Sequence, residues 1–234
     1  APDLRGFNLS DKPKYKGAYS IKNSARDVIG LIERAVPGEK VVLVGHDWGG
    51  SVAWQVAYDR PDLVEHLIAL NIPHPRQIKD VERRPWHYPK EFLGGNYVRV
   101  LGLPHVPELL FKNILGFSKA YDTFVLGNMV HKGNLSAEDK APTIQSWKVP
   151  GALESGTDYY RDGANYTRSL PDVPVIMPVT LVFGLKDMFM PARFAREFLA
   201  FPPGAEVVLL EDSGHYVQHD RPDDVNQAIL EAIR

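Results

Sequence analysis

The segment that most constrains this chain is the run of residues 41–50, VVLVGHDWGG. Its first four residues are apolar, which is typical of a strand buried on both faces of a parallel sheet. Gly45, Asp47 and Gly49 then alternate with other residues, and a helical pattern begins at Ser51. This is the spacing of a nucleophile elbow, a tight strand-to-helix turn that strains its central residue and brings two backbones close enough to need glycine.

The residue at the centre of this turn is Asp47, where serine is usual. A carboxylate is already ionised at pH 7, so it attacks an sp³ carbon directly and leaves an alkyl ester on the enzyme. The alternative is that Asp47 only caps the following helix, a common role for aspartate. The flanking glycines and the preceding strand favour the elbow.

Length, net charge and composition limit the kinds of partner and chemistry that this protein can have. A length of 234 residues suits one α/β domain with an insertion. The net charge of −2 gives no reason to expect nucleic acid or an acidic membrane as partner, and no apolar run reaches transmembrane length. Without cysteine there is no thiol nucleophile, and the eight histidines lack metal-ligand spacing. We therefore expect a cytoplasmic protein, monomeric or homodimeric, that uses neither metal nor cofactor.

Apolar runs and helical periods alternate along most of the chain, which predicts a parallel sheet covered by helices on both faces. The segment 76–170 lacks a clear strand and is broken by prolines, so we expect a helical cap inserted between two parts of an α/β core, 1–75 and 171–234. Strands are expected at 41–44, 63–71, 178–184 and 205–210, and helices at 24–35 (capped by Ser24), 51–58, 192–199 and 223–233.

Two further residues, Asp187 and His215, follow expected strands, where reactive groups gather in such sheets. The chain order Asp47, Asp187, His215 is that of the α/β-hydrolase triad. His215 would be the general base, Asp187 would orient its imidazole, and the Trp48 backbone N–H would stabilise an oxyanion. Alone, Asp187 and His215 would be an ordinary turn aspartate and loop histidine.

Several motifs together resemble the epoxide hydrolases of the α/β-hydrolase superfamily, which are related to haloalkane dehalogenases. The resemblance implies addition of water to a small-molecule epoxide, giving a vicinal diol without a cofactor. It also implies that the family's first strands, with a second oxyanion donor, would precede Ala1. The motifs are PDLRGFNLS at 2–10, GHDWGG at 45–50, NIPHP at 71–75, GLKD at 184–187 and SGHYVQHDRP at 213–222.

The same resemblance implies a pair of cap tyrosines that protonate the epoxide oxygen. Tyr97 and Tyr160 match them, with Tyr159 as the alternative if the register differs by one residue. For the substrate pocket we expect Trp48, Phe189 and His74, since His74 lies near the entry to the cap.

Two other functions remain open at this stage. A haloalkane or haloacid dehalogenase would use the same Asp47, but halide is a weakly basic leaving group that needs only N–H donors. The tyrosine pair, and His46 before the nucleophile, therefore favour an epoxide. The other is an inactive truncated hydrolase fragment that keeps the motifs but lacks the strands needed for turnover.

Overall fold

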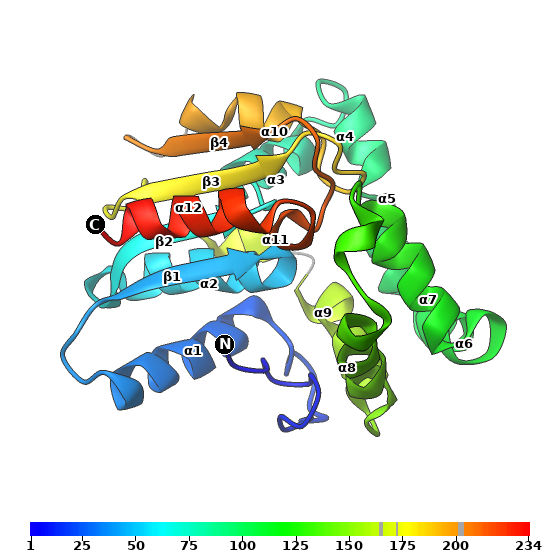
Figure 1. The fold of residues 1–234 in the computed structure, drawn as a ribbon. Coiled ribbons are helices and arrows are strands. Elements are labelled where there is room, and N and C mark those ends of the chain that lie inside the picture. Colours follow the sequence, from blue (N-terminus) through cyan, green and yellow to red (C-terminus); the bar gives the residue numbers. More distant parts are fainter. Residues whose placement is uncertain (164–165, 172, 201–203) are drawn as a thin grey trace.

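A computed structural model describes residues 1–163, 166–171, 173–200 and 204–234. Four parallel strands form one sheet in the order β1-β2-β3-β4 (Figure 1). The strands are β1 (Val41–His46), β2 (Val64–Leu70), β3 (Val179–Gly184) and β4 (Glu206–Leu210). The α/β class expected from the alternating pattern is confirmed.

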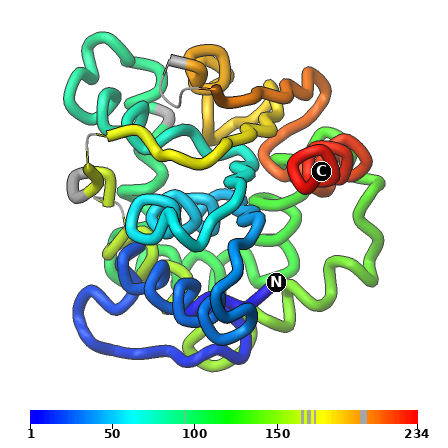
Figure 2. Tube along the Cα trace, turned by 90° about the vertical axis from the view of Figure 1, so that its left-hand side faces the viewer, coloured from blue at the N-terminus to red at the C-terminus, as the bar shows by residue number. Residues whose placement is uncertain are grey.

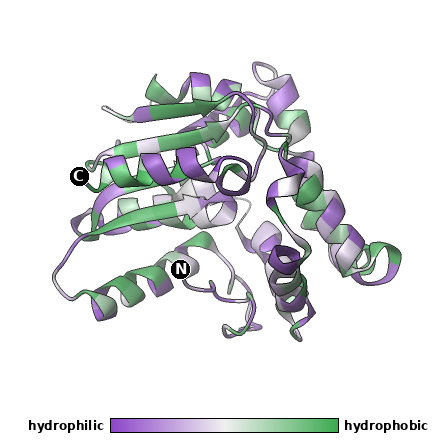
Figure 3. Cartoon of the chain, in the orientation of Figure 1, coloured by the Kyte–Doolittle hydropathy of each residue, from purple (hydrophilic) through white to green (hydrophobic). Residues whose placement is uncertain are grey.

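Alternate residues of the strands belong to two different cores, as the twofold period of a strand requires. In β2, Leu67 and Ala69 pack with α1 (Ile21–Ala35) and α2 (Asp47–Asp59), whereas Ile68 and Leu70 pack with α12 (Pro222–Ala232). The helices α2 and α12 therefore lie on opposite faces of the sheet (Figure 2). The strands are mostly apolar (Figure 3), and β3, which lies between β2 and β4, is buried along its whole length.

Between β2 and β3 the described residues form helices and turns but no strand. Most of these helices lie beyond the carboxyl ends of the strands (Figure 1), so they stand over the edge where the reactive groups were expected. They are α3 (Pro75–Arg83), α4 (Pro89–Gly94), α5 (Asn96–Leu101), α6 (Val106–Leu109), the π-helix Leu110–Leu115, α7 (Phe117–Phe124), α8 (Ala137–Lys148) and α9 (Ala152–Asp162), with 3₁₀ turns at Leu126–Asn128, Lys132–Asn134 and Tyr166–Ser169.

Two expected elements differ from the structure. Helix α1 begins at Ile21, because Ser20 rather than Ser24 caps it; Ser24 is buried inside the helix, where its hydroxyl bonds Tyr159. The helix expected at 192–199 is split into α10 (Arg193–Arg196) and a 3₁₀ turn at Phe198–Ala200. Within the described ranges, no helix has the length and apolar character needed to cross a membrane.

Candidate active site

The turn at residues 45–50 has the geometry of a nucleophile elbow. Asp47 joins β1 to α2 with a φ of 51°, a left-handed conformation that is strained for a residue with a side chain. A Cβ on Gly45 would lie 2.6 Å from the Gly49 carbonyl oxygen, and one on Gly50 would lie 2.3 Å from Ile72. Both glycines are therefore required by close packing, and the turn projects the Asp47 side chain from the carboxyl edge of the sheet.

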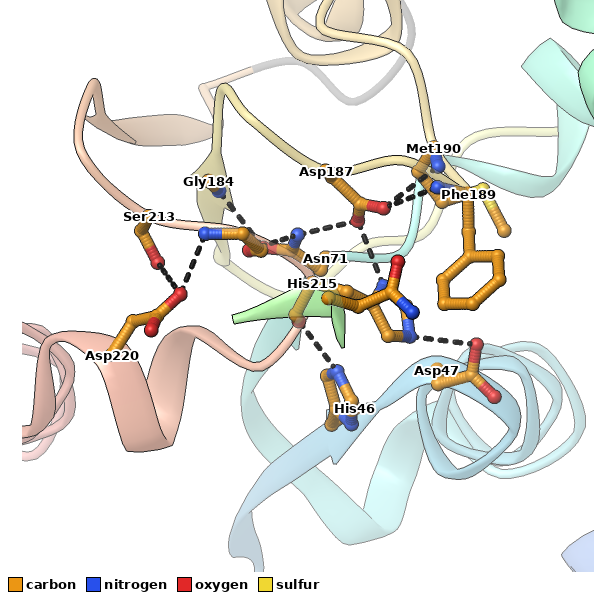
Figure 4. A network of polar contacts seen from close by, with 12 residues as sticks. His46, Asp47, Asn71, Gly184, Asp187, Phe189, Met190, Ser213, His215 and Asp220 are labelled. Carbon is orange, nitrogen blue, oxygen red and sulfur yellow. Dashed lines mark hydrogen bonds and ion pairs between the residues drawn. The ribbon is translucent and has the colours of Figure 1, made fainter. Parts of the chain in front are cut away.

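His215 lies between the carboxylates of Asp47 and Asp187 at the carboxyl edge of the sheet (Figure 4). Its Nδ1 is 2.8 Å from Asp187 Oδ2, and its Nε2 is 3.3 Å from Asp47 Oδ2. Asp187 follows β3 and His215 follows β4, so three separate strand ends bring the three side chains together. The three side chains that the sequence order predicts to lie together are thus within contact distance of one another.

The Asp187 carboxylate is held by several donors in addition to His215. Its Oδ1 accepts the backbone N–H groups of Phe189, at 2.7 Å, and Met190, at 2.9 Å (Figure 4). Its Oδ2 accepts the Asn71 side-chain amide at 2.5 Å. These bonds fix the orientation of the carboxylate, and through it the imidazole of His215.

Asn71 was missed as a site residue by the sequence analysis. It is fully buried directly after β2, with a φ of 44°. Besides Asp187, its amide N–H bonds the Gly214 carbonyl at 3.1 Å, and its side-chain oxygen accepts the Gly184 N–H at 2.9 Å. Its sequence signal is a lone polar residue at the end of a buried strand, the same kind of position as Asp47.

The charges at this site stabilise one another. Burial by itself lowers the pKa of His215, but the hydrogen bonds to Asp187 and Asp47 outweigh it and raise the pKa to about 10. Burial by itself would raise the pKa of Asp47, but the bonds from His215 and from the Trp48 backbone N–H hold it below its ordinary value. At neutral pH His215 is therefore an imidazolium and Asp47 is ionised.

His46 supports the loop that carries His215. Its Nε2 lies 2.9 Å from the His215 backbone carbonyl, and the two rings are 4.7 Å apart. Burial lowers the pKa of His46 to about 4, so its imidazole is neutral and donates this hydrogen bond. Asp220 holds the same loop, because it accepts the Gly214 N–H at 2.7 Å and also the backbone N–H groups of Val130 and His131.

Tyr97 of α5 and Tyr160 of α9 line a cavity together with Asp47, and their ring centroids are 6.4 Å apart. Tyr97 packs on Phe189 and Tyr160 on Trp48, at centroid distances of 4.9 and 5.2 Å. Burial, and then the nearby Asp47 charge, raises the pKa of each tyrosine, so both hydroxyls keep their protons at neutral pH.

Tyr159 points the other way from its neighbour Tyr160. It is fully buried, and its hydroxyl bonds the Arg5 carbonyl and the Ser24 hydroxyl, both at 3.0 Å. The side chain that α9 directs to the site is therefore Tyr160.

Two cavities meet at Asp47. One, of about 550 Å³, is largely apolar and extends under α8 and α9; the other, of about 380 Å³, extends toward α3 and α4 and carries more polar groups, including Glu82 and Glu91. Trp48, Tyr97 and Phe189 line both cavities with Asp47. Trp48 and Phe189 therefore line these cavities, and their contact with a substrate stays a prediction.

The expectation for His74 needs correction. His74 is fully buried, caps α3, and packs against Trp54 at 4.8 Å and Phe198 at 6.5 Å between ring centroids. It belongs to the core and is not among the residues that line either cavity. Among the described residues, no group of three or more His, Asp or Glu side chains is placed to hold a metal ion.

A histidine between two aspartates at the carboxyl edge of a parallel sheet, one of them on a strand-to-helix elbow, is the arrangement typical of α/β hydrolases. Comparison with known families agrees: the model of the alpha/beta hydrolase fold matches residues 1–222. The chain belongs to this family.

Its relatives include epoxide hydrolases. The AB hydrolase superfamily protein YfhM of Bacillus subtilis is 36% identical over the whole chain and 79% of its own length. Epoxide hydrolase 3 of Xenopus tropicalis is 31% identical, and this chain spans 63% of its length. Among solved structures, an epoxide hydrolase from Bacillus megaterium superposes with a TM-score of 0.84 at 27% identity, over 99% of this chain and 82% of that one.

Proposed function

We propose that this protein is an epoxide hydrolase, which adds water to an epoxide and gives a vicinal diol through an alkyl ester on Asp47. The observation that carries the proposal is the position of Asp47. It pairs with His215, which Asp187 holds, and it lines one cavity together with Tyr97 and Tyr160, whose hydroxyls keep their protons. Relatives named as epoxide hydrolases support the same reaction.

In the first step an Asp47 oxygen attacks one ring carbon and the carbon–oxygen bond of the epoxide breaks. The departing alkoxide is a strong base, so it needs a proton from Tyr97 or Tyr160. The raised pKa of both tyrosines keeps them as donors until the alkoxide, which is more basic, develops.

Esterification also changes His215. The ester carries no charge, so Asp47 stops raising the pKa of the imidazolium, which then falls. The proton that the imidazolium loses replaces the one that the tyrosine gave to the substrate. The site is left with a neutral imidazole, still oriented by Asp187, which is a competent general base.

In the second step His215 takes a proton from water and the resulting hydroxide adds to the ester carbonyl. The Trp48 N–H, which bonds the Asp47 carboxylate in the free enzyme, stabilises the oxyanion. Collapse of the intermediate releases the diol, whose oxygen takes the proton of the carboxylic acid. Asp47 is again a carboxylate and His215 an imidazolium, so the cycle is closed.

A product assay tests this proposal. Styrene oxide and a short bromoalkane are incubated in parallel with the wild type and with Asp47→Asn, and diol and bromide are measured. Diol formed only by the wild type supports the proposal. Bromide without diol would assign the chain to the dehalogenases, and neither product would favour an inactive fragment.

A single turnover in ¹⁸O-labelled water tests the ester itself. If water attacks the ester carbonyl, the label enters the Asp47 carboxylate and not the first diol molecule. Label in that first diol would mean that water attacks the epoxide directly, and the covalent mechanism would be wrong.

A further inference from the structure

The residue after Tyr160 connects the two helices that carry the tyrosines. Arg161 reaches from α9 to the end of α5, where its Nε donates to the Gly102 carbonyl at 3.3 Å and its Nη2 to the Leu103 carbonyl at 3.0 Å. Gly102 is the residue that ends α5, the helix of Tyr97. One guanidinium therefore binds the last turn of one tyrosine helix from within the other.

A carboxylate on α6 holds this guanidinium in place. Glu108 accepts Arg161 Nη2 at 2.8 Å and the Thr157 hydroxyl at 3.0 Å, and its side chain is only 13% exposed. Asp158 accepts Nη1 at 2.7 Å. Burial lowers the pKa of Arg161, but the bonds to Asp158 and Glu108 outweigh it, so the guanidinium stays charged and satisfied.

The two helices are also in close backbone contact at this point. A Cβ on Gly102 would lie 3.2 Å from the Val98 carbonyl oxygen and 3.3 Å from that of Tyr160. The end of α5 therefore rests on the backbone of Tyr160 itself. Any shift of Arg161 moves the helix of Tyr97 relative to Tyr160.

We propose that Arg161 is a positioning residue, which sets the spacing of Tyr97 and Tyr160 so that both hydroxyls reach one epoxide oxygen. This assignment rests on the proposed function. The planar fork of arginine binds two neighbouring carbonyls and a carboxylate at once, which a lysine ammonium does not do with the same geometry. Small displacements of a reacting group cost large factors in rate, about 10²-fold for 1 Å.

The experiment measures alkylation alone. In a His215→Gln background the ester is not hydrolysed, so mass spectrometry of the intact protein follows the attachment of styrene oxide to Asp47. We expect Arg161→Gln to slow alkylation about 10- to 100-fold, and Arg161→Lys to lie between it and the parent. Lys112→Gln is the matched control: Lys112 pairs with Glu154 of the same helix α9 but binds neither carbonyl at the end of α5, so alkylation should stay within about twofold.

A double-mutant cycle separates positioning from general loosening of the helices. If Arg161 acts through the tyrosines, Arg161→Gln has no further effect on the alkylation rate once Tyr97 and Tyr160 are both phenylalanine. The same rate loss in both backgrounds would overturn the assignment, as would parental alkylation by Arg161→Gln in an enzyme that forms diol. A wild type that forms no diol would overturn the proposed function and, with it, this role.

Discussion

The two halves of the site are held in different ways. Asp47, Asp187 and His215 stand on strand ends and are connected by buried hydrogen bonds, with Asn71 bonded to two of the three strand-end loops. Tyr97 and Tyr160 stand on helices connected by Arg161 and its partially exposed ion pairs. The sheet fixes the charged groups, while the helices beyond it fix the proton donors. Loss of His215 should therefore stop ester hydrolysis, loss of a tyrosine should slow alkylation, and loss of Asp47 should prevent both steps.

The largest effect is expected in the sheet half. Asp47→Asn removes the nucleophile, so diol formation should fall by at least about 10⁴-fold. His215→Gln should lose turnover to a similar extent but still form one alkyl-enzyme per molecule, because alkylation does not need the base. Steady-state assays and intact-protein mass spectrometry check both variants. An alkylated Asp47→Asn would contradict the nucleophile assignment.

In the cap half, Tyr97→Phe and Tyr160→Phe should each slow alkylation by about 10- to 100-fold, and the double variant by about 10²- to 10⁴-fold. Hydrolysis of the preformed ester should be unchanged, because that step uses His215. Rapid-quench measurements separate the two rates. Tyr159→Phe is the control: it loses buried hydrogen bonds and some stability, but its hydroxyl faces the core, so alkylation should not change.

Asn71→Ala should lower both the stability of the protein and the rate of ester hydrolysis, because Asn71 bonds the backbone of the core as well as Asp187. Each buried group left unpaired costs roughly 1–3 kcal/mol of unfolding free energy. Ester hydrolysis should slow more than alkylation, since Asp187 loses a donor and the imidazole its fixed orientation. Denaturant titration and single-turnover rates measure the two effects.

Gln77→Ala is the control for Asn71→Ala. Gln77 is also a buried amide, and it bonds the Phe194 carbonyl at 2.7 Å and the His74 N–H at 3.1 Å, away from His215. It should lower stability without changing the ratio of the two rates. An unchanged ratio in Asn71→Ala as well would remove Asn71 from the site.

The smallest effect concerns pH. Burial lowers the pKa of His46 to about 4 and that of His74 to about 3. Both histidines titrate near 6.5 when unfolded, so the stability of their neutral folded forms is complete above that pH. It is lost as the pH falls through about 6.5 toward the folded values, at up to about 1.4 kcal/mol per pH unit for each histidine.

Denaturant titrations between about pH 7 and pH 4.5 measure this slope, and His46→Gln and His74→Gln should each reduce it. Stability that is flat across this range in the wild type would mean that neither histidine is held neutral in the fold. The difference between the sheet half and the cap half of the site would then be tested only by the kinetic variants.

The sheet half could be predicted from the sequence more fully than the cap half. Continuous apolar runs identify the buried strands, and Asp47, Asp187 and His215 follow three of them, so topology alone brings them to one edge. The bounds of helices were predicted less well: Ser24 was expected to cap α1, but it lies inside the helix, where its hydroxyl contacts the Tyr159 hydroxyl, and Ser20 is the cap.

The residues that escaped prediction act through contacts between distant segments. Asn71 bonds residues more than a hundred positions away, and no local pattern records such a partner. His74 was wrongly placed for the converse reason, because nearness to the cap entry in sequence does not say which way a ring faces. The link between Arg161 and α5 joins residues almost sixty positions apart, so it exists only in the folded chain.

The neighbouring tyrosines of α9 have a further consequence. Tyr159 anchors the helix to the core while Tyr160 faces the nucleophile, and one residue turns an α-helix by about 100°. Deleting a single codon within α9 ahead of this pair would therefore move Tyr160 into the anchor position of Tyr159 and Arg161 into the position of Tyr160. Within the helix, any insertion or deletion of one residue changes which side chains face the core and which face the cavity.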